Sequence, residues 1–480
     1  MRKPIMINTA RIAVVGGGIA GSSVALYLSE LGLNVTLFEK GKSLVNGPPM
    51  CHLHAGGNLY REISDTQCIT LLKQSIDLLR FYPFSVDYRP TVIAVPIEDK
   101  AEPKDLLPRL KRLQTEYASL ITTDPDNKVL GEVDEYFKLY DKEEIALLQR
   151  RSIAEYPTTM DEWMIPVVKH IDLDKVKFPL LLVQEYGLNV FRMGAGITLA
   201  IEEISSCELL LETKVTDIAC KNGEWLVNYI QGSHTEQKSF DYLVNAAGFR
   251  SGTLDDTLGF KQERMVEFKA AYVTKWDTSN TIFPEIIFHG ERGTPRGMAQ
   301  FTPYPGGYFQ LHGMTKEITL FDDGFSSSSK QSAQPQLPKR FVEKIERSWS
   351  PSLINERTRS AIKHIAQFVP DFKDAQVASK PLYGAQQIPG IDPELRAADV
   401  SFEGEHYARC EVVKASSVLD AIDAIVKNLI VLGYLDPSQL GERVFEVLKN
   451  LKESEIEALA KKLAQARGYP TAMAGRMISG

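Results

Sequence analysis

The feature that most constrains the fold is the segment RIAVVGGGIAG at residues 11–21. The run RIAVV is mostly apolar and β-branched, which predicts a strand buried in a parallel sheet. Gly16, Gly18 and Gly21 follow with the spacing G-x-G-x-x-G, and the apolar stretch behind them predicts a helix. A second strand is expected at residues 34–38, so the chain should begin with a βαβ unit.

The glycine spacing gives each glycine a separate physical role. Gly16 permits a tight turn, Gly18 lets the backbone approach a pyrophosphate, and Gly21 lets the helix pack closely against the strand. The first helical turn contains Ile19 and Ala20 and offers N–H groups and the positive end of the helix dipole to phosphates.

An acidic residue stands at the tip of the second expected strand. Glu39 can accept hydrogen bonds from both hydroxyls of an adenosine ribose, and Lys40 beside it is included in the predicted cofactor site. Strand, glycines, helix, strand and acid occur in the order that dinucleotide binding requires, and the sequence therefore predicts this function. A glycine-rich turn without a ligand would leave Glu39 unexplained.

The later sequence departs from a purely nicotinamide-dependent enzyme, which would usually continue with more βα units. A capped helix is expected at 64–82, a turn and helix at 187–204, and a hairpin with its turn at Asn222–Gly223. An apolar strand then ends in NAAG at 245–248. An adenine-binding sheet that is interrupted by excursions and completed near residue 245 is a flavoprotein layout.

Three segments carry a resemblance to a known family. They are VVGGGIAGSSVALYLSELGLNVTLFEK (14–40), TKVTDI (213–218) and YLVNAAGFRSGTL (242–254). In them the chain resembles FAD-dependent oxidoreductases of the D-amino-acid-oxidase (DAO) type. That family includes glycine and sarcosine oxidases, glycerol-3-phosphate dehydrogenases and L-2-hydroxyglutarate dehydrogenases. The resemblance is good over residues 10–60 and 185–260, loose over 290–430, and absent over 95–185 and 436–480.

The resemblance implies an α/β fold in which a Rossmann-like FAD-binding domain is interleaved with an antiparallel-sheet substrate domain and followed by a helical C-terminal tail. The expected FAD-binding parts are 1–90, 187–260 and 380–433, with a mixed insertion at 91–186, a substrate domain at 261–379 and the tail at 434–480. It also implies that Val215 holds the adenine through its backbone. Ala247 and Gly248 would contact the cofactor.

The substrate half is expected to contain strands with short turns between residues 262 and 324, followed by helices at 339–353 and 356–372. Tyr308, Gln310 and His312 alternate along one strand and share a face, which in the family meets the substrate. His312 is therefore a candidate catalytic residue. His289 ends a similar strand, and further anion-binding candidates are Arg250, Arg292 and Arg296.

A loop and a long helix near residues 412–426 correspond to the family element whose N-terminus points at the flavin N1–C2=O edge, which becomes anionic on reduction. The family usually has glycines in this loop, whereas this chain has KASS. The residues expected against the cofactor are Lys414, Ala415, Ser416 and Ser417, with either serine as the N-cap. Lys414 is interpreted either as a cation beside the flavin or as a solvated residue.

Arg409 shortly precedes this loop. Its guanidinium could clamp a substrate carboxylate or phosphate with two hydrogen bonds, or it could form a structural ion pair with a nearby acid.

The stretch CHLHAGGNLYREIS at 51–64 suggests several kinds of site. A zinc site needs three or four converging ligands, and this loop supplies at most three, so no metal is expected. Cys51 or a histidine could instead tether FAD covalently, or the loop could simply face solvent. In the family this loop runs under the flavin, which would place His54, Ala55, Gly56 and Gly57 against the ring and make His54 a catalytic candidate.

The predicted reaction is hydride transfer from a small anionic 2-hydroxy acid or amino acid to flavin N5. An alcohol needs a base for its hydroxyl proton, so His54 and His312 favour a hydroxy acid. Three alternatives remain: an amine or amino-acid oxidase, a flavin-dependent RNA-modifying enzyme, and a non-catalytic interaction protein with an FAD fold. The electron acceptor, whether oxygen, a quinone or a protein, is left open.

Composition narrows the classes of function that remain possible. A net charge of −7 over 480 residues gives no electrostatic footprint for nucleic acid, and no apolar run approaches the length of a membrane span. The five scattered cysteines favour reduced thiols in a cytoplasm over a disulfide framework. The tail reads as two amphipathic helices that dock on the protein's own body or contact a membrane surface or a partner.

Overall fold

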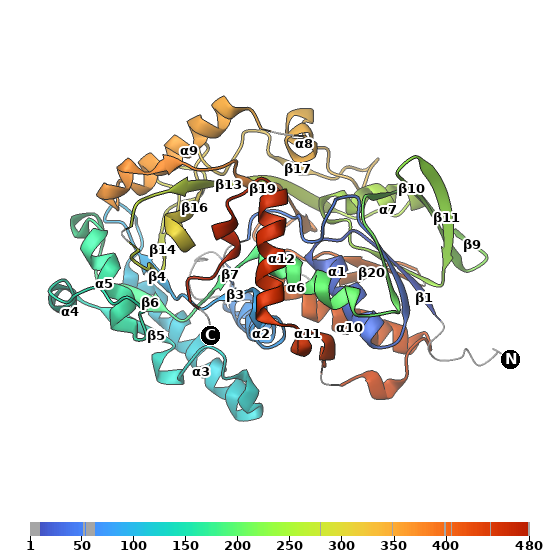
Figure 1. Ribbon diagram of the computed structural model, residues 1–480, viewed down its shortest axis with the longest axis horizontal. Helices are drawn as coiled ribbons and strands as arrows, with labels where there is room; N and C mark the ends of the chain where they lie inside the picture. Colours follow the sequence, from blue (N-terminus) through green and yellow to red (C-terminus); the bar gives the residue numbers. More distant parts are fainter. Residues whose placement is uncertain are drawn as a thin grey trace.

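The computed structural model describes residues 10–50, 53, 63–278, 280–347, 349–397, 400–404, 406–441 and 443–478. Figure 1 shows two halves, each built around a sheet, with the mostly parallel sheet to the right and the large, mostly antiparallel sheet to the left. The red helix α12 (Glu453–Ala466) crosses the front between them.

The predicted βαβ unit is confirmed. Strand β1 (Arg11–Val15) leads through helix α1 (Ile19–Glu30) to strand β2 (Asn34–Phe38), and the two strands pair in parallel. Strand β12 (Tyr242–Asn245) pairs with β1 on its other side, so the NAAG segment returns to the first sheet as expected. The N-terminus and the middle of the chain thus build one sheet.

This sheet has six strands in the order β20-β21-β12-β1-β2-β8. Its outer strands are β8 (Cys207–Leu210), β20 (Val400–Phe402) and β21 (Tyr407–Cys410). Ile12 and Val14 of β1 join the core cluster that the helices share, whereas Ala13 and Val15 join the core of a smaller sheet on the opposite face. This alternation is why a short apolar strand can be buried on both faces.

The smaller sheet contains β9 (Thr213–Lys221), β10 (Glu224–Gln231) and β11 (His234–Phe240). Asn222 and Gly223 connect the first two strands with φ angles of 53° and 83°. Positive φ at both central residues is the requirement of a type I′ hairpin turn, so the predicted hairpin is confirmed.

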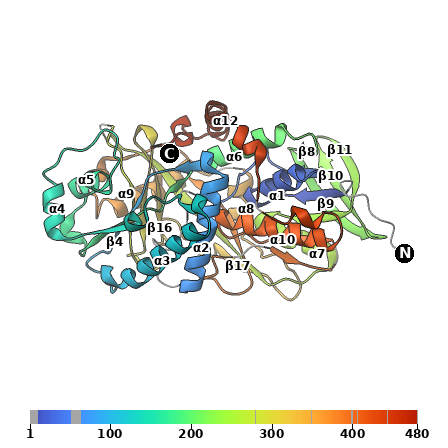
Figure 2. The same cartoon turned by 90° about the horizontal axis from the view of Figure 1, so that it is seen from below.

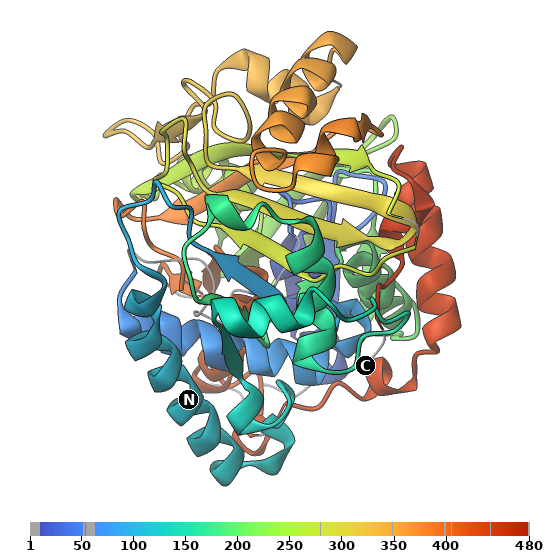
Figure 3. The same ribbon diagram turned by 90° about the vertical axis from the view of Figure 1, so that its left-hand side faces the viewer.

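The large sheet follows the order β17-β13-β16-β15-β14-β4-β6-β5 and includes β18 and β19, which pair with β13. Helix α9 (Pro351–Ile365) lies over its central strands, as the orange helices above the yellow strands in Figure 3 show. The strands are β4 (Thr91–Ala94), β5 (Phe137–Tyr140), β6 (Leu180–Val183), β13 (Arg264–Lys275), β14 (Glu285–Phe288), β15 (Ala299–Tyr304), β16 (Tyr308–Gly313), β17 (Phe325–Ser327), β18 (Gln376–Val377) and β19 (Leu382–Pro389).

The remaining elements cover these sheets, apart from a short pair formed by β3 (Val86–Asp87) and β7 (Gly187–Leu188). The other helices are α2 (Asp65–Phe81), α3 (Leu107–Thr123), α4 (Lys142–Leu148), α5 (Met160–His170), α6 (Val190–Glu202), α7 (Ser251–Leu258), α8 (Lys339–Glu346), α9 (Pro351–Ile365), α10 (Val418–Val431) and α11 (Glu446–Asn450).

Three local predictions need correction. Residues 317–324 form turns rather than a strand, because Thr319 folds back and exchanges hydrogen bonds with Gly313 at the end of β16. The helix predicted at 339–353 ends at Glu346, and Pro351 begins the next one. Only half of the predicted capping box at α2 is used, since the Gln67 side-chain oxygen accepts from the Arg396 backbone N–H instead.

The C-terminal tail docks on the protein's own body. Helix α12 packs along α6, and the two helices lie side by side in Figure 2. Beyond α12, the side-chain amide of Asn189 donates hydrogen bonds to the carbonyls of Met473 at 2.8 Å and Gly475 at 3.1 Å. Within the described ranges, none of the helices has the length and apolar character needed to cross a membrane.

A carboxylate under the tail should make stability depend on pH. The Glu30 Oε1 accepts a hydrogen bond from the Val447 backbone N–H at 2.8 Å, and burial raises the pKa of Glu30 from its ordinary 4.5 to about 7. Because the folded protein holds this proton more tightly than the unfolded chain does, the group costs stability as pH rises from 4.5 to about 7.

We expect Glu30→Gln to weaken this pH dependence and to be more stable than the wild type above about pH 7. Urea unfolding midpoints of both proteins, measured on either side of this window, test the expectation. If the urea midpoints of the two proteins changed with pH to the same extent, the expectation would be refuted.

Candidate active site

The glycine turn after β1 leaves no room for side chains at two positions. A Cβ on Gly16, whose φ is 108°, would lie 2.4 Å from the Ala246 carbonyl oxygen. A Cβ on Gly21 would lie 1.9 Å from the Gly16 carbonyl oxygen, so only glycine lets α1 pack this closely. The positive φ of Gly16 fits the tight turn predicted there, and the close approach at Gly21 fits the predicted packing of helix against strand.

Gly18 differs from both, because a Cβ there would meet no atom within 4 Å. Gly18 is the N-cap of α1, and among the described residues no side chain caps this helix end. The N-terminal N–H groups of the helix therefore face open space that has room for a phosphate group.

That open space belongs to a cavity of about 500 Å³ between the two sheets. One wall comes from the start of α1 and from residues 45–50, and a second from the end of β12 at Ala246, Gly248 and Phe249. The opposite wall comes from β13, β15, β16 and β19 of the large sheet, and residues 410–415 complete it. The cavity thus joins the expected cofactor side to the expected substrate side.

Many of the predicted residues meet in this wall. From the cofactor side it contains Gly18, Ile19, Ala20, Gly248, Lys414 and Ala415. From the substrate side it contains His289, Arg292 and His312, together with Gln310. His289 is buried and His312 is half-buried.

Other predicted residues that the structure describes lie outside the wall. Ala247 lies between the lining residues Ala246 and Gly248. Glu39 and Lys40 lie beside the glycine turn but outside the cavity wall, and Val215 lies near the start of β9. Arg250 pairs with Glu346 at 2.8 Å, and Arg296 pairs with Glu98 at 3.3 Å. Neither arginine therefore enters the site assembled here.

The Glu39 carboxylate holds the turn together. Its Oε2 accepts from the Gly17 N–H at 2.7 Å, and its Oε1 accepts from the Gly41 N–H at 2.5 Å. An ionised carboxylate has about four acceptor positions, so two remain for ribose hydroxyls. Burial lowers the pKa of the neighbouring Lys40.

Of the two predicted N-cap candidates, Ser417 is the N-cap residue of α10, but it does not cap the helix through its side chain. Both serines are buried, and neither caps α10 with its side chain. The Ser417 hydroxyl instead donates to the Gln74 side-chain oxygen at 3.0 Å, which ties the start of α10 to α2. Lys414 and Ala415 remain the residues of this loop that reach the cavity.

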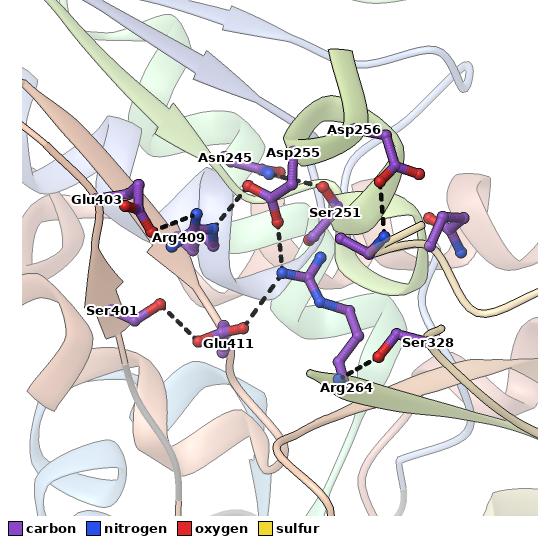
Figure 4. A network of polar contacts seen from close by, with 12 residues as sticks. Asn245, Ser251, Asp255, Asp256, Arg264, Ser328, Ser401, Glu403, Arg409 and Glu411 are labelled. Carbon is purple, nitrogen blue, oxygen red and sulfur yellow. Dashed lines mark hydrogen bonds and ion pairs between the residues drawn. The ribbon is translucent and has the colours of Figure 1, made fainter. Parts of the chain in front are cut away.

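Arg409 is placed in a structural ion-pair network rather than against the cavity. Its side chain is 1% exposed, and its Nε donates to the Asp255 Oδ1 at 2.6 Å. Figure 4 shows Asp255 between Arg409 and Arg264, whose Nη2 lies 2.5 Å from the other Asp255 oxygen. Arg264 also approaches Glu411 at 3.6 Å. The predicted substrate contact of Arg409 is therefore replaced by a structural role.

Asp255 should matter for folding because its carboxylate pairs with two buried arginines. We expect Asp255→Asn to lower the free energy of unfolding by about 3–5 kcal/mol, the cost of leaving buried charges without their partner. Urea denaturation measures this loss. Glu457→Gln, which breaks the exposed pair with Lys461, is the control and should change stability by less than about 0.5 kcal/mol. Similar small losses in both variants would contradict the assignment.

Sequence reasoning missed a charged triad at the cavity. Lys269 lines the wall, and its Nζ lies 3.0 Å from the Glu267 carboxylate. Arg292 also pairs with Glu267. Although burial opposes ionisation, Lys269 and Arg292 hold the pKa of Glu267 below its ordinary value. Glu267 and Lys269 alternate with apolar residues along β13, and this pattern could have revealed a polar stripe on one face.

Two amides of β19 were also missed. The Gln386 Nε2 donates to the Val413 carbonyl at 2.7 Å, and the Gln387 Nε2 donates to the Cys410 carbonyl at 2.9 Å. They fasten the loop that carries Lys414 to the large sheet. Two consecutive glutamines in an otherwise apolar strand were a usable signal, whereas the cavity-lining Arg396 lies in a loop with no such pattern.

The wall carries an excess of positive charge. Among the described residues, four cationic side chains line it, Lys269, Arg292, Arg396 and Lys414, against the two acids Glu291 and Glu394. Counting Glu267, which pairs with Lys269 and Arg292, still leaves an excess of one positive charge. The predicted residues His54, Ala55, Gly56 and Gly57, with Cys51 as the alternative tether, lie outside the described residues.

Comparison with known proteins agrees with this geometry. Residues 11–124 match the family of FAD dependent oxidoreductases called DAO. No curated protein sequence matches the chain. The structure resembles L-amino acid deaminase from Proteus vulgaris with a TM-score of 0.58 and 12% identity, covering 94% of this chain and 99% of that one.

Two further solved structures show the same fold. Glycine oxidase from Geobacillus kaustophilus has a TM-score of 0.55 and 14% identity, covering 90% of this chain and 98% of that one. Glycerol-3-phosphate dehydrogenase from Bacillus halodurans, solved with FAD, has a TM-score of 0.55 and 12% identity, covering 96% of this chain and 73% of that one. The predicted fold class is confirmed over most of the chain.

The chain is thus an enzyme of the FAD-dependent oxidoreductase class and carries the DAO-type domain at its N-terminus. Its cofactor is FAD, and the residues present fit that group: Gly18 leaves open space at the N-terminus of α1, and the cavity continues from there to the large sheet.

Proposed function

We propose that the protein oxidises a small anionic 2-hydroxy acid or 2-amino acid in the cavity between its two sheets. The observation that carries the proposal is the excess of cationic over acidic side chains among the described residues of the cavity wall. Such a wall attracts carboxylates, and a guanidinium can hold a carboxylate through two parallel hydrogen bonds.

The proposed site residues have separate roles. Bound FAD supplies the hydride acceptor at N5. Lys269 and Arg292 on the large sheet, with Lys414 on the loop before α10, would hold the substrate carboxylate. His312 on β16 would take the hydroxyl proton at an imidazole nitrogen, a task that histidine performs near neutral pH. Gly18, Ile19 and Ala20 would face the pyrophosphate of the cofactor.

An amino acid is the second candidate substrate. The similar solved structures include an amino acid deaminase and a glycine oxidase as well as a glycerol-3-phosphate dehydrogenase. A neutral amine needs less help from a base than an alcohol does, so His289 and His312 in the cavity wall favour the hydroxy acid.

Anaerobic mixing of the holoprotein with 2-hydroxy acids, 2-amino acids and their methyl esters tests this function. We expect the flavin absorption to bleach with at least one acid and not with its ester at the same concentration. Equal bleaching by the ester would remove the role of the cationic wall, and no bleaching by any acid would overturn the proposed substrate class.

We also propose a cytoplasmic location. It is supported by the cysteines that the structure describes, Cys68, Cys207, Cys220 and Cys410, which are free thiols.

A further inference from the structure

The C-terminal segment reaches the cofactor side of the cavity through one side chain. Helix α12 ends at Ala466, and Gly468, with a φ of 73°, turns the chain away from the helix axis. Arg467 between them directs its guanidinium at residues 43–45. Its Nη2 donates to the Leu44 carbonyl at 2.6 Å, and its Nη1 donates to the Val45 carbonyl at 3.0 Å.

The Arg467 guanidinium also contacts a side chain of the same loop. Its Nε and Nη2 donate to the Ser43 hydroxyl at 3.2 Å and 3.0 Å. Three consecutive residues are therefore held by one guanidinium, which presents five N–H donors in a fixed plane.

The loop that Arg467 holds belongs to the cofactor site. Val45 lines the cavity, and its N–H donates to the Gly17 carbonyl at 2.8 Å. The Leu44 side chain covers the same glycine so closely that a Cβ on Gly17 would lie 2.6 Å from it. A displacement of residues 44 and 45 would therefore move the glycine turn that faces the phosphates.

The loop adopts a conformation that needs support. Val45 has a φ of 56°, and a β-branched residue in the left-handed region is a genuine outlier. Arg467 binds the carbonyl groups on both sides of the Val45 N–Cα bond, the Leu44 and Val45 oxygens. These hydrogen bonds therefore hold the peptide groups on both sides of the strained residue.

The surroundings of Arg467 are built for this contact. The guanidinium lies 5.7 Å from the ring centre of Phe191 on α6. A Cβ on Gly194 of the same helix would lie 3.1 Å from the Leu44 carbonyl oxygen and 3.6 Å from the guanidinium, so a side chain there would crowd the contact. Burial lowers the pKa of Arg467 to about 10, and the side chain stays cationic at neutral pH.

We propose that Arg467 is a positioning residue of the FAD site, and that it sets FAD affinity by fixing residues 43–45 against the glycine turn. The C-terminal segment is then part of the cofactor site rather than an appendage. The inference presupposes FAD but not the proposed substrate, so FAD affinity tests it independently of catalysis.

The test is a fluorescence titration of apoprotein with FAD for the wild type, Arg467→Met and Arg467→Lys. We expect Arg467→Met to raise the FAD dissociation constant roughly ten- to hundredfold, as the loss of one or more charge-assisted hydrogen bonds would. Lysine keeps a charge and donors, so Arg467→Lys should recover part of the affinity. The thermal midpoint of each apoprotein separates this effect from a general loss of stability.

Arg476→Met is the matched control, because Arg476 belongs to the same tail but donates to the Pro83 carbonyl at 2.9 Å and not to residues 43–45. It should leave FAD affinity unchanged. Ser43→Ala removes one acceptor and should weaken FAD binding to a smaller degree even if Arg467→Met does not fold. Wild-type FAD affinity in Arg467→Met, or equal losses in Arg467→Met and Arg476→Met, would overturn the proposal. For a non-folding Arg467→Met, wild-type affinity in Ser43→Ala would do so.

Discussion

Gly18→Val is expected to fold like the wild type and to lose at least 99% of its affinity for FAD. The backbone of Gly18 has φ −66° and ψ 179°, which any residue adopts, and a Cβ meets nothing within 4 Å. The added side chain would instead fill the space in front of the α1 N-terminus that the pyrophosphate needs. A hundredfold rise in the dissociation constant corresponds to about 2.7 kcal/mol.

Fluorescence titration with FAD measures the predicted loss of affinity, and the thermal midpoint of the apoprotein measures whether the variant folds like the wild type. Gly441→Val is the matched control, because a Cβ there also meets nothing within 4 Å and Gly441 is not part of the cavity wall. Wild-type FAD affinity in Gly18→Val would show that FAD does not approach this turn. Unfolding of Gly18→Val would contradict the open space at this position.

His312→Asn should lower kcat/KM for a 2-hydroxy acid by a factor of about 10²–10⁴, the usual contribution of a general base. Oxidation of an amino acid should fall less, because a neutral amine needs less help with its proton. Asparagine keeps a polar side chain of similar reach, so the cavity wall should stay closed. Steady-state kinetics with both substrates provides the comparison.

The control for this variant is His234→Asn, which changes an exposed histidine on β11 in the small sheet. It should leave both activities and the FAD content unchanged. A His312→Asn enzyme with normal hydroxy-acid kinetics and normal FAD content would eliminate His312 as the base and leave His289 as the other histidine among the described residues of the cavity wall.

Local sequence patterns were sufficient to predict the dinucleotide-binding half of the fold. The βαβ unit around Gly16 and the hairpin at Asn222–Gly223 depend on glycine chemistry and on the periodicity of apolar residues within short segments. The return of β12 to the first sheet was also predictable, because an apolar strand that ends in small residues suits a buried place beside β1.

The candidate site was less predictable, because its members depend on partners that are distant in sequence. Arg409 looks the same in sequence whether it meets a substrate or Asp255, which is 154 positions away. Ser417 resembles an N-cap, yet its hydroxyl bonds to Gln74, 343 positions away. Arg467 gave no signal at all, since nothing local relates the tail to residues 43–45.

The FAD content of the purified, folded protein tests the assignment of the cavity most directly. We predict about one FAD for each chain, released on denaturation or, if the cofactor has been lost, taken up again on adding FAD. A folded chain that neither contains FAD nor binds added FAD would contradict the assignment of the cavity, and with it the proposed reaction and the proposed role of Arg467.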